Sequence, residues 1–108
     1  MNAKIELLQA IGGRMIRCAL ITSAPYWHEE GDPSYVKAVL KEGYGKEDID
    51  SFLSVLNGVN YDSSYGSQEL FGTVWFEDGT WMERGEYDGS EWWEIRKMPA
   101  IPEQCLDN

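Results

Sequence analysis

The spacing of apolar residues along the first part of the chain predicts a helix followed by a strand. The segment AKIELLQAI places its apolar residues at helical spacing before a double glycine, which predicts an N-terminal helix within residues 1–13. The next run, RMIRCALIT, is apolar and β-branched, and it predicts a strand over residues 14–23. A buried helix shows a similar apolar run over so few residues, so that alternative stays open at the level of sequence.

Two further segments show helical periodicity, and together they predict a helical pair over residues 33–57. In the first segment, Pro33 suits the first position of a helix, apolar residues recur on one face, and a glycine ends the pattern. In the second segment, Ile49, Phe52 and Leu56 recur at helical spacing, and acidic residues occupy the first turn, where the helix dipole favours them. Both helices are therefore expected to pack through an apolar face.

The segment 70–98 combines apolar and aromatic runs with two Asp-Gly turn signals, and it predicts a three-stranded antiparallel meander. A two-residue loop at the first turn pairs Phe76 with Trp81. One step further along the ladder, it pairs Trp75 with Met82. Because cross-strand pairs of this kind stabilise a hairpin by roughly 0.2–1 kcal/mol each, this register is the predicted one.

The second Asp-Gly turn allows two registers. A two-residue loop sets Glu83 opposite Glu94, whereas a four-residue loop sets Glu83 opposite Arg96. The longer loop also sets Tyr87 opposite Trp92. Because like charges directly opposed in a ladder are unfavourable, the longer loop is predicted.

These elements combine into an α+β fold, in which the C-terminal meander packs against two or three short helices and the N-terminal strand is a candidate to join the meander. A length of 108 residues fits one domain, so residues 1–108 are expected to form a single domain with a loose tail over residues 99–108. Because side chains alternate along a strand, the meander is expected to have one face on the helices and one face in solvent. The inward set is Trp75, Met82, Trp93 and Ile95, and the outward set is Glu83, Tyr87, Trp92 and Glu94.

Charge narrows the classes of partner. Nineteen acidic and nine basic residues give a net charge of -10, which repels nucleic acid and anionic membranes and favours partners with a basic surface. The helical pair is therefore not expected to be a helix-turn-helix that reads DNA, because it would present carboxylates to phosphates. With neither a secretion signal nor an apolar span of membrane length, the chain is expected to be cytoplasmic. Cys18 and Cys105 are then expected to be free thiols, although the sequence alone leaves a disulfide between them open.

Motifs of catalysis and metal binding are missing from the sequence. His28 is the single histidine, and the carboxylates beside it in the run HEEGD are too close along the chain to surround a metal ion. The sequence contains no nucleophile elbow, phosphate-binding loop, dinucleotide fingerprint, zinc-protease motif or Cys-x-x-Cys pair. We therefore expect a non-enzymatic protein with no catalytic residue, no metal and no cofactor.

The meander instead predicts a protein-binding surface. Between Glu77 and Glu94, acidic residues greatly outnumber the single base Arg84, and they alternate with aromatic residues. Aromatic side chains anchor interfaces, and charges accelerate and orient encounter, so this combination favours docking onto a basic partner. A merely solvated acidic face carries equal weight. The predicted partner-binding residues are Glu83, Glu86, Tyr87, Asp88, Glu91, Trp92 and Glu94.

In the run DGTWMERGEYDGSEWWE, within residues 61–103, the chain resembles a set of small acidic proteins from phages and prophages. The resemblance implies a phage-encoded inhibitor of host machinery, of the anti-CRISPR or anti-restriction kind, that occupies a nucleic-acid-binding groove by nucleic-acid mimicry. Its expected partner is a basic, nucleic-acid-binding host protein such as a CRISPR effector. Two alternatives stay open: an immunity protein that neutralises a basic nuclease toxin, and a small ligand-binding domain with a pocket near Trp27 and His28.

Overall fold

The computed structural model describes residues 2–23, 36–60, 69–87, 90–99 and 102–106. In chain order, its elements are α1 (Ala3–Ile11), β1 (Ile16–Ser23), β2 (Val36–Leu40), α2 (Lys46–Asn57), β3 (Leu70–Phe76), β4 (Trp81–Tyr87), β5 (Ser90–Arg96) and α3 (Glu103–Leu106). Within the described residues, none of these helices is both long and apolar enough to cross a membrane.

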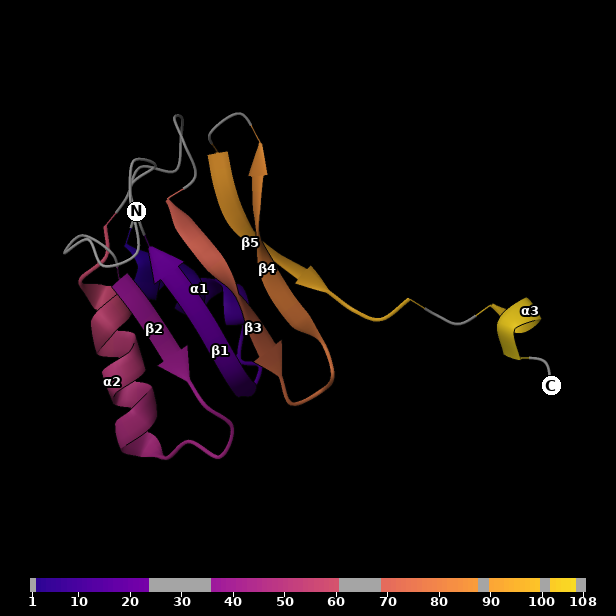
Figure 1. Ribbon diagram of the computed structural model, residues 1–108, viewed down its shortest axis with the longest axis horizontal. Helices are drawn as coiled ribbons and strands as arrows, with labels where there is room; N and C mark the ends of the chain where they lie inside the picture. Colours follow the sequence, from indigo (N-terminus) through magenta and orange to yellow (C-terminus); the bar gives the residue numbers. More distant parts are fainter. Residues whose placement is uncertain (1, 24–35, 61–68, 88–89, 100–101, 107–108) are drawn as a thin grey trace.

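The five strands form one antiparallel sheet with the order β2-β1-β3-β4-β5 (Figure 1). The α+β class is confirmed, and β3, β4 and β5 form a meander that β1 joins alongside β3. The number of strands differs from the prediction, because β2 adds a further strand beyond β1. The tail, predicted to be loose, contains α3, which stands apart from the sheet in Figure 1.

The predicted helical pair is wrong in its first half. Val36–Leu40 is strand β2, which pairs with β1. Over these five residues both periods fit the sequence, because Val36, Val39 and Leu40 recur at helical spacing and a two-residue alternation is equally possible. In the structure the alternation holds: Ala38 and Leu40 are buried, and the residue before each of them is exposed. Pairing with the neighbouring strand β1 favours the extended form, which is a tertiary effect that local periodicity does not contain. Residues 33–35 lie outside the described residues.

Helices α1 and α2 form where the sequence predicts them. Helix α1 begins after Asn2, whose side-chain oxygen accepts a hydrogen bond from the Ile5 N–H at 3.1 Å, as expected of an N-cap. Helix α2 begins after Gly45, whose N–H donates to the Asp48 carboxylate at 2.9 Å. Both N-terminal ends are thus closed by local side-chain contacts, which the polar residues of the sequence supply.

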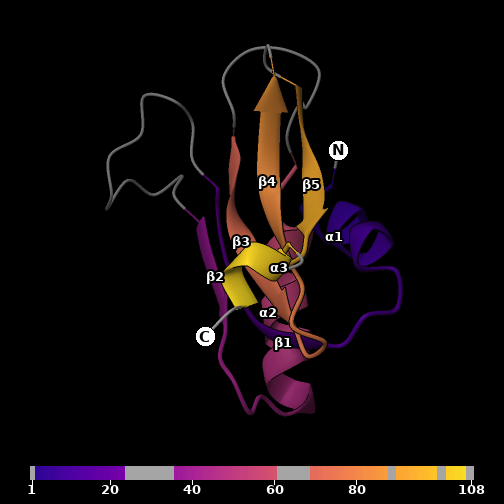
Figure 2. The same cartoon turned by 90° about the vertical axis from the view of Figure 1, so that its right-hand side faces the viewer.

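Both helices pack on the same face of the sheet (Figure 2). The core between helices and sheet consists of side chains exposed by 3% or less. The helices contribute Ala3, Leu7, Phe52 and Leu56, and the strands contribute Ala19, Ile21, Ala38, Leu40, Leu70, Val74, Phe76 and Met82.

The first hairpin of the meander has a register one residue away from the predicted one. Trp75 pairs with Trp81 rather than with Met82. The Phe76 N–H donates to the Thr80 carbonyl at 2.9 Å, which closes a three-residue loop with Gly79 at a φ of 87°. Since a one-residue shift moves a strand's side chains to the opposite face, Trp75 lies on the face away from the helices, which corrects its assignment to the inward set.

Asp78 stabilises this three-residue loop. Its carboxylate accepts hydrogen bonds from the Thr80 hydroxyl and, at 2.9 Å, from the Thr80 N–H. The hydroxyl contact and then the backbone contact hold the pKa of Asp78 below its usual range. The Asp-Gly signal therefore predicts a turn correctly, and the contact between Asp78 and Thr80 accompanies a loop one residue longer than predicted.

The second hairpin adopts the register that the sequence analysis rejected. Glu83 lies opposite Glu94, and Tyr87 lies opposite Ser90. The repulsion is offset by Arg96, whose Nε lies 3.6 Å from Glu83 Oε2 and whose Nη2 lies 3.3 Å from Glu94 Oε2. A base two positions further along the strand thus neutralises the two opposed acids diagonally, which a rule based on directly opposed pairs does not consider.

Candidate protein-binding face

The sheet face opposite α1 and α2 is here named the open face, because no described helix covers it (Figure 2). Strand alternation and register place its residues. They are Lys37 and Val39 of β2, Cys18, Leu20 and Thr22 of β1, Phe71, Thr73 and Trp75 of β3, Trp81, Glu83, Gly85 and Tyr87 of β4, and Ser90, Trp92, Glu94 and Arg96 of β5.

Large apolar side chains on the open face remain exposed to solvent. Leu20, Val39, Phe71, Trp75 and Trp92 are exposed by 41%, 46%, 42%, 41% and 40%, respectively. Two of these residues are directly paired, because Leu20 lies opposite Val39, and Trp75 lies opposite the half-buried Trp81. Single exposed apolar residues are ordinary, whereas several on one face are typical of surfaces that take part in binding.

The Trp92 ring lies close to the backbone of Gly85, in space that a side chain at this position would fill. These two residues are directly paired, and a Cβ at Gly85 would lie 2.7 Å from Trp92 Nε1. Glycine in a strand allows this close approach of the ring to the backbone. Trp92 is therefore positioned before any partner arrives, which lowers the entropy that binding would cost.

We predict that Gly85→Ala displaces the Trp92 ring and shifts tryptophan fluorescence, while the free energy of unfolding changes by about 1 kcal/mol or less. The cost is small because the clashing ring is 40% exposed and can rotate away. Urea unfolding in the wild-type and Trp92→Ala backgrounds measures the coupling. An equal cost of Gly85→Ala in both backgrounds would contradict the contact.

The carboxylates of the open face form a small charged group at its β4 and β5 side. Glu83 and Glu94 have half-exposed side chains, and Arg96 lies between them. The Trp81 indole N–H donates to Glu83 Oε1 at 2.7 Å, which fixes both the ring and the carboxylate. This part of the face can exchange its internal ion pairs for a basic group of a partner.

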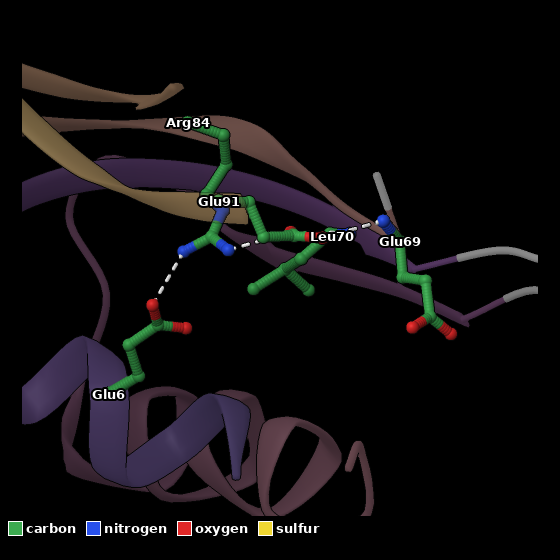
Figure 3. Close-up of polar contacts among 5 residues, drawn as sticks. All are labelled: Glu6, Glu69, Leu70, Arg84 and Glu91. Carbon is green, nitrogen blue, oxygen red and sulfur yellow. Dashed lines mark hydrogen bonds and ion pairs between the residues drawn. The ribbon is translucent and has the colours of Figure 1, made fainter. Parts of the chain in front are cut away.

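Glu91, one of the predicted partner-binding residues, is buried on the other side of the sheet (Figure 3). Its side chain is 0% exposed, and its Oε1 lies 2.6 Å from Arg84 Nη2. Arg84 Nη1 lies 3.0 Å from Glu6 Oε2 of α1. Glu91 also accepts hydrogen bonds from the N–H groups of Glu69 and Leu70, at 2.8 and 3.0 Å. It therefore links β5 to β4 and to the start of β3, and it is not accessible to a partner.

Arg84 also contacts an aromatic ring. Its guanidinium carbon lies 5.0 Å from the centre of the Trp93 ring, within the range of a cation–π contact. Trp93 packs against the core, as predicted for an inward residue, and so does Met82. Ile95 lies on the same side, opposite Met82, but is 42% exposed.

The structure divides the predicted partner-binding residues between the two faces. Glu83, Tyr87, Trp92 and Glu94 share the open face. Glu86 pairs with the buried Glu91 and is therefore on the other face, although it is itself exposed. Asp88 lies outside the described residues, as do Trp27 and His28 of the alternative ligand pocket.

Sequence reasoning missed the part of the open face that lies on the central strands β1 and β3. Leu20 and Phe71 are apolar although they point away from the helices. A strand that is apolar at both alternating positions is typical of a sheet covered on both faces. The unbroken run CALI in β1 was therefore the available signal for a second covered face.

A hollow of about 400 Å³ opens where the first hairpin meets β1. Its lining includes Cys18, Trp75 and Thr80, together with the ion-paired Arg17 and Glu42. Burial, and secondarily Glu42, raises the pKa of the Cys18 thiol, which lowers its thiolate fraction at neutral pH. Among the described residues, histidine, cysteine and acidic side chains form no group of three that could hold a metal ion.

Comparison of the chain with protein-family models, curated proteins and solved structures finds no match. The open face combines exposed apolar and aromatic side chains, a shallow hollow, and a group of charged side chains on β4 and β5. Protein interfaces have this composition, with aromatic residues enriched and charges depleted at the centre.

Proposed function

We propose that this chain is a non-enzymatic inhibitor that docks through its open face onto the basic surface of a nucleic-acid-binding host protein in the cytoplasm. One observation carries the proposal. Five large apolar or aromatic side chains, exposed by 40 to 46%, lie on the sheet face that no described helix covers, in a chain whose net charge is -10.

The apolar centre supports binding to a protein rather than to nucleic acid or a small metabolite. Trp75 and Phe71 occupy the central strand of the sheet, where a docked partner would exclude water most completely. Aromatic residues at the centre of an interface commonly supply most of its binding free energy. The rest of the face then needs only shape complementarity.

The charge supports a basic partner. A strongly negative chain raises the rate of encounter with a positive surface and orients the approach. Only Glu83 and Glu94 of the predicted carboxylates lie on the open face among the described residues. In the proposal, the negative electrostatic field of the whole chain therefore mimics nucleic acid. The aromatic residues of the open face anchor the chain to its partner.

The resemblance to small acidic phage proteins supports the choice of partner class. A phage protein that blocks the nucleic-acid groove of a CRISPR effector or restriction enzyme needs negative charge and a rigid docking surface. The composition supplies the negative charge, and the five-stranded sheet supplies an extended surface for docking.

Affinity capture from the host cytoplasm, followed by titration with the purified candidate, tests the proposal. The full chain is compared with Trp75→Ala and with Val55→Ala, a control equally exposed at 41% but located on α2. We expect a basic, nucleic-acid-binding protein whose affinity falls by about tenfold or more with Trp75→Ala and is unchanged with Val55→Ala. Affinity should also fall as salt rises.

Two results would overturn the proposal. One is a partner that binds Trp75→Ala as tightly as the wild type, because the open face would then not carry the contact. The other is binding that does not change between low and high ionic strength, because the negative charge would then have no role.

A further inference from the structure

The open face also fits a second copy of this chain. We infer that the free protein pairs through its open face as a weak two-fold dimer, which the partner displaces; the displacement rests on the proposed function. Dimerisation would cover the apolar residues until the partner is met. The inference draws on the charges of the face, its symmetry and its area.

The open face is locally neutral although the chain is strongly negative. Its charged side chains at paired strand positions are Lys37, Glu83, Glu94 and Arg96, two of each sign. The net charge of -10 makes two copies repel one another through most of their surface. The open face is therefore a region where two copies can meet without that repulsion.

The arrangement of these charges favours a particular symmetry. Lys37 lies on edge strand β2, whereas Glu94 and Trp92 lie on the opposite edge strand, β5. A two-fold axis that runs along β3, in the plane between two stacked sheets, places β2 of one copy over β5 of the other. Each Lys37 then faces the strand that carries Glu94 and Trp92, and this complementary contact occurs twice.

The same axis places apolar residues at the centre of the pair. β3 is the middle strand of the sheet, and its outward side chains are Phe71, Thr73 and Trp75. With the axis along this strand, the two copies of Phe71 and Trp75 pack against each other. Two twisted sheets stacked in this way form the aligned packing of β-sandwiches.

The area of the face indicates a weak dimer. Strands about 4.8 Å apart, with a rise of about 3.4 Å per residue, give this five-stranded face dimensions of roughly 24 by 24 Å. Two copies would bury roughly 1,100 Å² in total, at the lower limit of specific interfaces. Such a dimer dissociates readily, so a partner with a larger or more basic surface can replace the second copy.

Sedimentation equilibrium of the full chain, from micromolar to millimolar concentration, tests the inference. We expect a concentration-dependent equilibrium between monomer and dimer in the wild type. Trp75→Glu should remain monomeric, because it places a charge at the centre of the interface. Val55→Glu, a matched substitution on α2, should dimerise like the wild type.

A charge exchange tests the symmetry. We expect Lys37→Glu to weaken the dimer by about tenfold, and the double variant Lys37→Glu/Glu94→Lys to restore part of that loss. A wild type that stays monomeric throughout, an equal loss with Val55→Glu, or a double variant no better than Lys37→Glu would overturn the inference.

The outcomes separate this inference from the proposed function. A monomeric wild type whose partner binding is lost with Trp75→Ala would overturn the dimer and leave the proposed function intact. A dimer that Trp75→Glu disrupts, in a chain whose partner binds independently of Trp75, would support the dimer and overturn the proposed function.

Discussion

Glu91→Gln is expected to lower the free energy of unfolding by about 3 kcal/mol or more. The Glu91 carboxylate is fully buried and lies 2.6 Å from the Arg84 guanidinium. It also accepts hydrogen bonds from the backbone N–H groups of Glu69 and Leu70. Removing its charge leaves Arg84 buried with one carboxylate fewer, and an amide cannot accept all three donors well. Urea unfolding followed by tryptophan fluorescence measures the change.

The matched control is Glu94→Gln on the same strand. Glu94 is also paired with an arginine, at 3.3 Å, but its side chain is 46% exposed. An exposed pair contributes about 1 kcal/mol or less, so this variant should be almost as stable as the wild type. Equal losses in both variants would mean that burial does not distinguish the two ion pairs.

Gly72→Ala is expected to destabilise the protein by about 3 kcal/mol or more, or to prevent folding. Gly72 has a φ of 150°, and it lies opposite Ile21 in the ladder that joins β1 to the meander. A Cβ at this position would lie 2.4 Å from the Leu20 carbonyl oxygen and 2.9 Å from Ile21 Cα. Both are backbone atoms, so β1 and β3 would have to separate. Urea unfolding, or circular dichroism if no folded baseline remains, measures the loss.

Gly13→Ala provides the control for this substitution. Gly13 also has a positive φ, 85°, but its Cβ would have no atom within 4 Å. It therefore carries only the conformational cost, about 1 kcal/mol. A Gly72→Ala variant no less stable than Gly13→Ala would show that the two strands can adjust to the added methyl group.

Helices α1 and α2, strand β1 and the C-terminal meander were predictable because each has a strong local signal, whereas α3 was not predicted. Apolar periodicity and glycine stops identify α1 and α2, and the Asp-Gly turns identify the meander. β2 was not predictable in the same way. Its five residues fit both periods, and only pairing with β1 distinguishes a strand from a helix.

The registers of the two hairpins were less predictable than the strands themselves. They depend on contacts between side chains that are not directly opposed in the ladder. The Asp78 contact with Thr80 accompanies the longer first loop, and Arg96 permits Glu83 to face Glu94. The first is a contact between residues two positions apart in the loop, and the second is a diagonal contact between two strands. Rules for directly opposed pairs do not include them.

Half of the candidate site followed from strand alternation, and the rest required the fold. Alternation places Glu83, Tyr87, Trp92 and Glu94 together, as predicted. The burial of Glu91 did have a signal in the sequence, because the inward position of Arg84 requires an inward acid. The apolar run of β1 was a signal for a second covered face, but which strands share that face with β1 and β2 could be recognised only from their place in the sheet.

The central claim is that the open face is the surface through which this protein recognises its partner. Nuclear magnetic resonance of the isotope-labelled chain, titrated with the purified partner, tests it most directly. The account predicts that the largest amide shifts map to outward residues of the sheet, among them Leu20, Phe71, Trp75 and Trp92. Shifts concentrated on α1 or α2, with these residues unchanged, would contradict it.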